Sequence, residues 1–224
     1  FQVSTITSDN MTIQVTPLPS TSRYTQRELE GFAEIINHQF AAIIERNRIV
    51  AKNREFLRNA AVTGDGCMHF YFDPTIENGQ DVKGEIVAEI VDNLRVLFGN
   101  PNCRDVQRQP WIILVRRELV EDVRWRAEEL KKAGQCGIND PDSITADSDK
   151  FQNKYDSYTD DKVTVLTYYF RNRDTRTIWC MESTEKGILR NAYDTGYSLY
   201  PLIWINWDYI RDCYHGQALV TGML

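Results

Sequence analysis

The longest uninterrupted pattern in the sequence is a helical one that runs from Thr25 to about Val62. This stretch contains no proline, and its only glycine, Gly31, lies in the first turns. Apolar residues recur at helical spacing along it, with a shift of the apolar stripe near Asn47. Thr25 is followed by Glu28 in the pattern of a capping box. The stretch predicts one helix of about 55 Å, or two helices joined by a kink, which is typical of a strut in an elongated molecule.

The rest of the chain alternates strand patterns with further helices. Residues 3–15 have the loose alternation of an extended arm, and Gly64 is placed to end the long helix as a C-cap. The predicted strands are 67–72, 85–91, 94–98, 111–115, 163–170, 177–182 and 200–207. A charged helix is predicted over residues 117–132, and another helix is predicted to begin at Asp208 and to continue through Cys213.

These patterns predict an α+β fold, with a long N-terminal helix packed on a mixed, largely antiparallel sheet and with a second charged helix. We expect a single domain over residues 1–224. Its parts are an extended arm (1–24), the long helix (25–63), strands plus a helix (64–133), an acidic loop (134–161), and a hairpin, a strand and a truncated helix (162–224).

The composition limits the classes of protein to consider. Of the 224 residues, 42% are hydrophobic, which is enough for a core, and the formal net charge of -6 lacks the basic footprint of a free-standing nucleic-acid-binding protein. No apolar run reaches the roughly 18 residues that a membrane-spanning helix needs, so we predict no membrane partner. The five cysteines are scattered without a CxxC pair, which indicates free thiols in a reducing cytoplasm.

Motifs for catalysis or metal binding are missing from the sequence. The three histidines, His38, His69 and His215, have no partner at metal-binding spacing. The acidic loop does not follow the EF-hand pattern, because counting from Asp147 places Gln152 where that pattern needs glycine. Walker A, GxSxG and GxGxxG motifs do not occur. We therefore predict no catalytic, cofactor-binding or metal-binding residue and no cofactor.

A run of basic residues lies on the second half of the long helix. It is consistent with a strip that faces phosphate groups or a subunit interface. The interpretation that the sequence favours is a solvated helix face, because Glu45 and Glu55 are interspersed. The residues of this basic strip are Arg46, Arg48, Lys52, Arg54 and Arg58.

Aromatic residues gather in the last quarter of the chain. They are candidates for a subunit interface or for stacking on nucleic-acid bases, and the alternative is that they pack within a sheet core. The residues of this C-terminal aromatic group are Trp204, Trp207, Tyr209 and Tyr214.

The order of these elements resembles that of portal proteins from tailed bacteriophages and prophages, particularly phages of Gram-positive hosts. Three stretches carry the resemblance. The first is ERNRIVAKNREFLRNAAVTGDGCMHFYFD, a long helix that leads through a glycine turn into a strand. The second is GEIVAEIVDNLRVLFGNPNCRDVQRQPWIILVRRELVEDVRWRAEELK. The third is DKVTVLTYYFR followed by YPLIWINWDYIRDCYHGQALVTGML. Together they span most of residues 45–224.

The resemblance implies a structural subunit of a ring, usually dodecameric, at one vertex of a virion capsid and assembled in the bacterial cytoplasm. Double-stranded DNA passes through such a ring during packaging and ejection. The implied partners are further copies of the chain, the terminase, capsid or scaffold proteins and tail adaptors. The resemblance also implies that these residues form mostly the wing, that the stem and clip would follow Leu224, and that the protein is not an enzyme.

Two other functions are compatible with the sequence. One is an unrelated ligand-binding or enzymatic α+β domain with a pocket near the C-terminal aromatic group. The other is an interaction module of a bacterial surface system, against which the scattered cysteines argue.

Overall fold

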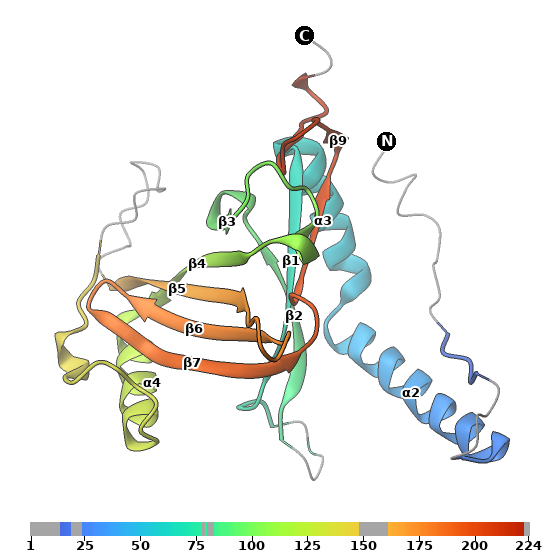
Figure 1. Cartoon of the computed structure of the whole chain (residues 1–224), viewed down its shortest axis with the longest axis horizontal. Helices are drawn as coiled ribbons and strands as arrows, with labels where there is room; N and C mark the ends of the chain where they lie inside the picture. The colour runs from blue at the N-terminus through green and yellow to red at the C-terminus, as the bar shows by residue number, and fades with distance from the viewer. Residues whose placement is uncertain (1–13, 19–23, 78, 80–82, 148–160, 222–224) are drawn as a thin grey trace. The chain divides into compact units, whose positions relative to one another are not determined.

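The computed structural model describes residues 14–18, 24–77, 79, 83–147 and 161–221. The chain forms two compact units (Figure 1). Unit 1 comprises the chain through Ile90 together with residues 202–209 and the segment from His215 onward. Unit 2 comprises residues 91–201 and 210–214. Among the described residues, no helix combines the length and the apolar character needed to cross a lipid bilayer.

The long helical stretch of unit 1 forms two helices, α2 (Gln26–Arg46) and α3 (Ile49–Thr63). The predicted capping box is present, with the Thr25 hydroxyl accepting from the Glu28 backbone N–H and the Glu28 carboxylate accepting from the Thr25 N–H at 2.8 Å. The break falls at Asn47 and at Arg48, whose φ of 50° is left-handed and ends the regular helix. Of the two alternatives from the sequence, the kinked pair is therefore the one that forms.

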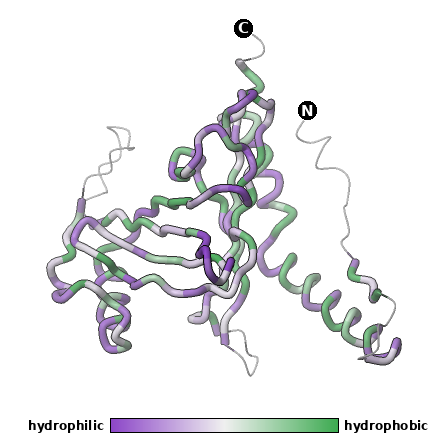
Figure 2. Tube along the Cα trace, viewed as in Figure 1, coloured by the Kyte–Doolittle hydropathy of each residue, from purple (hydrophilic) through white to green (hydrophobic). Residues whose placement is uncertain are grey.

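Helix α2 keeps an apolar face in contact with solvent. Ala33 is its one buried residue among those described. Apolar and polar residues alternate around it, as the changing colour along the tube shows (Figure 2). Four large side chains of this face are 40–60% exposed: Phe32, Ile35, Ile36 and Phe40. We call these four residues the α2 apolar stripe.

Helix α3 packs on a three-stranded sheet with the order β2-β1-β8. The strands are β1 (Asp65–Asp73), β2 (Glu85–Val91) and β8 (Leu202–Asn206), and β1 runs antiparallel to β8. Phe56 of α3 joins Met68 of β1 and Ala88 of β2 in the core of this unit. The Asn47 side chain contributes to the sheet, since it accepts from the Ala88 N–H and donates to the Ile86 carbonyl, both at 2.8 Å.

The helix predicted from Asp208 is wrong: the described residues from 208 to 220 contain no α-helix. They form the short strands β9 (Asp208–Tyr209) and β10 (Gly216–Gln217), with Asp212 in a left-handed conformation between them. Backbone donors around the segment bond to distant groups, because Trp207 N–H donates to the Gly64 carbonyl and Leu219 N–H donates to the Ala61 carbonyl. These tertiary hydrogen bonds take the place of a helical ladder.

Unit 2 is built on a five-stranded antiparallel sheet with the order β3-β4-β5-β6-β7. The strands are β3 (Val96–Phe98), β4 (Trp111–Leu119), β5 (Lys162–Arg171), β6 (Ile178–Thr184) and β7 (Gly187–Tyr197). Short 3-10 turns occur at Asn93–Arg95, Val106–Arg108 and Pro141–Ser143. Strand β7 was not predicted, because as an edge strand it buries only Leu189 and so lacks a regular alternation of buried and exposed residues.

Helix α4 (Val120–Lys132) covers one face of this sheet. It begins three residues later than predicted, because Arg117 to Leu119 continue β4 opposite β5. Alternation along β5 buries Val163 and Val165 against Val123 and Ala127 of the helix. The predicted α+β fold, with helices packed on largely antiparallel sheets, is confirmed.

Parts of several predicted segments lie outside the described residues, among them residues 78, 80–82 and 222–224. For the predicted arm these are residues 1–13 and 19–23, and for the predicted acidic loop they are residues 148–160. Within the described part of the arm, Val15 exchanges two hydrogen bonds with the Asn37 side chain of α2.

Candidate functional site

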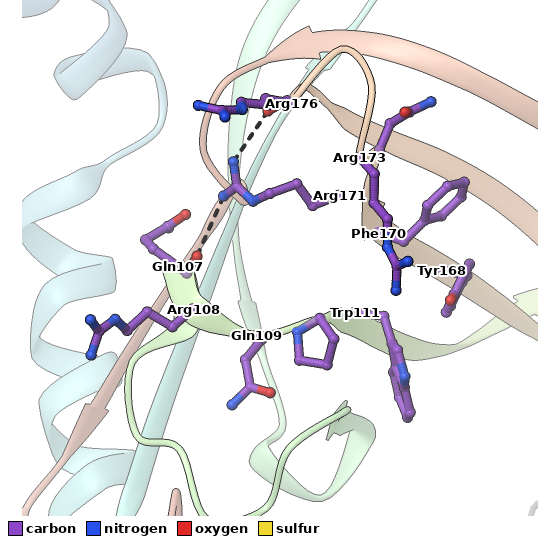
Figure 3. A pocket seen from close by; sticks show the side chains of 11 residues that line it. Gln107, Arg108, Gln109, Trp111, Tyr168, Phe170, Arg171, Arg173 and Arg176 are labelled. Atoms are coloured by element: carbon purple, nitrogen blue, oxygen red, sulfur yellow. Dashed lines mark hydrogen bonds between the residues drawn. The ribbon is translucent and has the colours of Figure 1, made fainter.

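A hollow of about 790 Å³ lies in unit 2 where the turn between β5 and β6 faces the segment before β4 (Figure 3). Its walls combine aromatic rings with arginine side chains. No carboxylate belongs to the residues that line it. The aromatic wall consists of Trp111, Tyr168 and Phe170, and the arginines are Arg108, Arg171, Arg173 and Arg176. We call this site the arginine hollow.

The rings share one face of the sheet because of strand register. Trp111 lies opposite Phe170, and Tyr168 is two residues before Phe170 on β5, so all three side chains point to the same side. That side is opposite the one that buries Val163 and Val165 against α4. The ring centroids are 6.1 Å apart for Trp111 and Tyr168 and 5.2 Å apart for Tyr168 and Phe170. The sequence gives only the alternation, and the pairing of β4 with β5 creates the row.

The arginines come from two segments with different roles. The Arg171 guanidinium donates to three backbone carbonyl oxygens. The distances are 3.2 Å to that of Arg176, 3.0 Å to that of Ser198 and 3.4 Å to that of Gln107. Arg108, Arg173 and Arg176 are exposed. Figure 3 shows Arg173 reaching from the turn toward the end of the hollow where Trp111 and Tyr168 lie.

The floor of the hollow is fixed by buried polar groups. The Gln109 amide accepts from Asn100 N–H at 2.8 Å and donates to the Cys103 carbonyl at 2.7 Å. Gln107 accepts from Tyr200 N–H at 2.8 Å, and the Tyr200 hydroxyl donates toward the Gln109 carbonyl at 3.0 Å. Burial raises the pKa of Tyr200. Because these groups satisfy one another, the segment that carries Pro110 and Trp111 is held rigidly.

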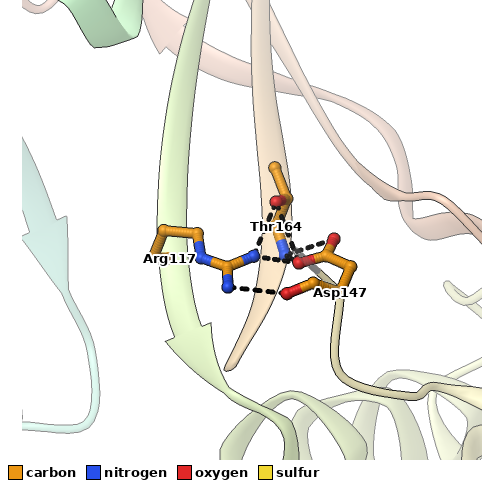
Figure 4. Close-up of polar contacts among 3 residues, drawn as sticks. All are labelled: Arg117, Asp147 and Thr164. Atoms are coloured by element: carbon orange, nitrogen blue, oxygen red, sulfur yellow. Dashed lines mark hydrogen bonds and ion pairs between the residues drawn. The ribbon is translucent and has the colours of Figure 1, made fainter. Parts of the chain in front are cut away.

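A second polar cluster of unit 2 anchors the described part of the acidic loop (Figure 4). The Arg117 guanidinium on β4 pairs with the Asp147 carboxylate and donates to the Asp147 carbonyl at 2.8 Å. Thr164 of β5 donates its backbone N–H to the same carboxylate at 3.0 Å. Arg117 is almost fully buried, so this ion pair lies inside the unit. Asp147 therefore acts as a structural anchor at the edge of the sheet.

In unit 1 the carboxylate of Asp65 organises the start of β1. It is 2% exposed and accepts from the Asn206 side chain at 2.7 Å and from Gly216 N–H at 2.6 Å. His215 Nδ1 lies 2.6 Å from its other oxygen. Three donors thus occupy two carboxylate oxygens, and we call Asp65, Asn206, His215 and Gly216 the Asp65 clamp. Sequence reasoning missed the clamp because its members lie up to 151 positions apart.

The residues of the basic strip do not share one surface. Arg46 pairs with Glu85 at 2.8 Å, and the Lys52 ammonium donates to the Ala88 carbonyl, so both side chains turn toward β2. Arg48 occupies the bend between α2 and α3. Arg54 and Arg58, one helical turn apart on α3, are exposed.

The C-terminal aromatic group is divided between the two units. The Trp204 ring lies 6.0 Å from that of His215 within unit 1. Trp207 is partly buried in the same unit, and Tyr209 is 51% exposed. Tyr214 belongs to unit 2, where its ring contacts Phe98 with centroids 4.8 Å apart. None of these four residues lines the arginine hollow.

Of the other two histidines, one is buried and one is exposed, and two of the cysteines are buried. His69 is buried and stacks on Tyr71, and His38 is exposed on α2 beside Glu34. Burial raises the pKa of the Cys67 thiol to about 12 and that of Cys180 to about 11. Within the described residues, no group of three or more His, Cys, Asp or Glu side chains is arranged to hold a metal ion.

No known protein family and no curated protein matches the chain.

Proposed function

We propose that the chain is part of a structural subunit of a phage portal, the head–tail connector ring through which double-stranded DNA is packaged and ejected. The α2 apolar stripe is the observation that carries this proposal. Phe32, Ile36 and Phe40 lie at i, i+4 and i+8, and Ile35 lies beside them, so all four form one face of a helix about 30 Å long. A helix face that the described residues of the chain leave exposed to this extent is suited to burial against another chain.

The occupant of this face is a neighbouring copy of the same chain. Copies related by a rotation that closes on itself form a ring, in which each subunit presents one surface to the preceding neighbour and a different one to the next. Helix α2 is suited to such a contact for two reasons. Its capping box and its 21 residues make it a regular helix, and Ala33 is the one residue that it buries among those described. The resemblance of three long stretches to portal proteins supports the same assembly.

The partners proposed with this function are the terminase, capsid or scaffold proteins and tail adaptor proteins, at the portal vertex of the virion. We propose a structural rather than a catalytic role. The Asp65 clamp supports that role, because each oxygen of its carboxylate already accepts from a donor of the chain's own closing segment.

The test is assembly of the natural protein that contains this chain, observed by negative-stain microscopy and analytical ultracentrifugation. We expect closed rings. Replacing Ile35 and Ile36 by glutamate should abolish them while leaving the circular dichroism spectrum unchanged, because two charges would have to be buried at the contact. His38→Glu, on the polar side of the same helix, is the matched control and should assemble normally. A monomer under all capsid-assembly conditions, or rings that tolerate Ile35→Glu/Ile36→Glu, would refute the proposal.

A further inference from the structure

The arginine hollow of unit 2 is a local exception to the charge of the chain. The whole sequence carries a formal net charge of -6, whereas the turn from Arg171 to Arg176 holds three arginines and one aspartate, a net charge of 3 − 1 = +2. Arg108 adds a fourth arginine from the opposite side. We propose that this hollow binds single-stranded nucleic acid, with the arginines on the phosphates and the aromatic wall under an unpaired base.

The positive charge of the hollow is not cancelled by its own lining. Arg171 donates to three backbone carbonyls, which stabilise the guanidinium without neutralising its charge. Arg108, Arg173 and Arg176 are exposed. Their guanidinium groups can therefore contact a ligand without first breaking buried interactions within the protein. A planar guanidinium binds phosphate oxygens through two parallel N–H groups, which makes arginine the residue suited to a phosphate backbone.

The aromatic wall determines which anion fits. Trp111, Tyr168 and Phe170 line the hollow as a row, and Trp179 on β6 extends the row with its ring centroid 6.3 Å from that of Phe170. Nucleic-acid bases stack on aromatic side chains whatever the base, because every base has a π face. An acidic peptide would use the arginines but would have no need of the rings. The row therefore favours a ligand that alternates negative charge with flat aromatic groups.

An unpaired strand fits the hollow better than a duplex does. In a duplex the faces of the bases are covered by their neighbours, so an aromatic side chain in the wall of a hollow cannot stack on them. The volume of about 790 Å³ lies within the range of roughly 300–1,000 Å³ that is usual for ligand sites. The hydrogen bonds of Gln107, Gln109 and Tyr200 hold the floor in place before any ligand arrives, which lowers the entropy cost of binding.

The experiment measures binding of fluorescently labelled oligothymidylate of about ten nucleotides to the chain by anisotropy, over a series of salt concentrations. We expect Trp111→Leu to weaken binding by about tenfold or more, because stacking on its ring is lost. Arg173→Ala should weaken binding and reduce the slope of log K against log salt by about 0.7, the value for one phosphate contact on a single strand. This exposed turn residue keeps the test valid if Trp111→Leu does not fold.

Matched controls are available elsewhere in unit 2. Trp125 of α4 is 62% exposed and Arg211 is exposed, and neither lines the hollow. Trp125→Leu and Arg211→Ala should leave both the affinity and the salt slope unchanged. An abasic oligonucleotide of the same length keeps the phosphates but removes the bases, so it should bind at least tenfold more weakly than oligothymidylate.

Four outcomes would overturn the proposal. The first is that oligothymidylate does not bind at moderate salt. The second and third are that the abasic strand, or a duplex, binds as tightly as oligothymidylate. The fourth is that polyglutamate displaces oligothymidylate while Trp111→Leu has no effect on binding. The last would assign the hollow to an acidic protein partner. The measurement does not depend on ring assembly, so it can fail or succeed independently of the portal proposal.

Discussion

The Asp65 carboxylate lies 2.6 Å from Nδ1 of His215, although the two residues are 150 positions apart in the chain. Asp65 is the first residue of β1, and His215 precedes β10. A carboxylate only accepts hydrogen bonds, so the ring nitrogen donates to it. Together with Asn206 and Gly216, this contact fixes the closing segment to the junction of α3 and β1.

Replacement of Asp65 by alanine should destabilise the protein by about 3 kcal/mol or more. The change removes the charged acceptor to which the Gly216 N–H and the Asn206 amide donate, and a hydrogen bond to a charged group contributes about 1.5–3 kcal/mol. The free energy of unfolding in urea measures the effect. Glu45→Ala, an exposed change on α2 in the same unit, should stay within about 0.5 kcal/mol of the parent. Equal stabilities for the two variants would show that the clamp contributes nothing.

Two glycine substitutions in unit 1 should have opposite effects. Gly64 has a φ of 94°, and a Cβ there would lie 2.6 Å from the Gly216 carbonyl oxygen, so Gly64→Ala should cost about 2 kcal/mol or more. A Cβ on Gly31 would meet nothing within 4 Å, and the residue lies inside α2. Gly31→Ala should therefore stabilise by about 0.5–1 kcal/mol. Thermal unfolding of both variants tests the pair, and a stabilised Gly64→Ala would contradict the packing described.

The cysteines should divide into two classes of reactivity. Burial raises the pKa of Cys67 to about 12 and of Cys180 to about 11, so both remain protonated and covered near pH 8. Cys103, Cys136 and Cys213 are partly exposed. Alkylation followed by peptide mass spectrometry should label these three first, and Cys67 and Cys180 only after urea is added. Rapid labelling of Cys67 in the folded protein would be the contrary result.

Stability should fall in mildly alkaline solution. A thiol whose folded pKa is raised favours folding fully below the unfolded pKa of about 8.5, and this contribution is lost as pH rises toward 11 and 12. Burial also raises the pKa of Tyr169 and Tyr193, which acts in the same direction at higher pH. The urea midpoint should therefore decrease between pH 7 and pH 10. Cys67→Ala/Cys180→Ala should flatten this dependence, and an unchanged slope would rule the thiols out as its source.

Local signals predicted the elements whose stability is local. The capping box of Thr25 and Glu28, the break at Asn47 and the alternation of β5 follow from hydrogen bonds and periodicities that span a few residues. The same signals failed where a segment's structure depends on the strand that pairs with it. Strand β7 forms because β6 provides a partner along its length, although Leu189 is the one residue of the strand that is buried.

The sequence by itself determined the α+β class, the helical stretch with its shift near Asn47 and the faces that β5 buries, because each depends on spacing along one segment. Only the tertiary structure decided the arginine hollow, the Asp65 clamp and the absence of the helix expected from Asp208. Those features depend on which strands pair and in what register, as when Trp111 meets Phe170 or Gly216 meets Gly64. Such contacts join groups that are distant in the chain, and no periodicity within a segment records them.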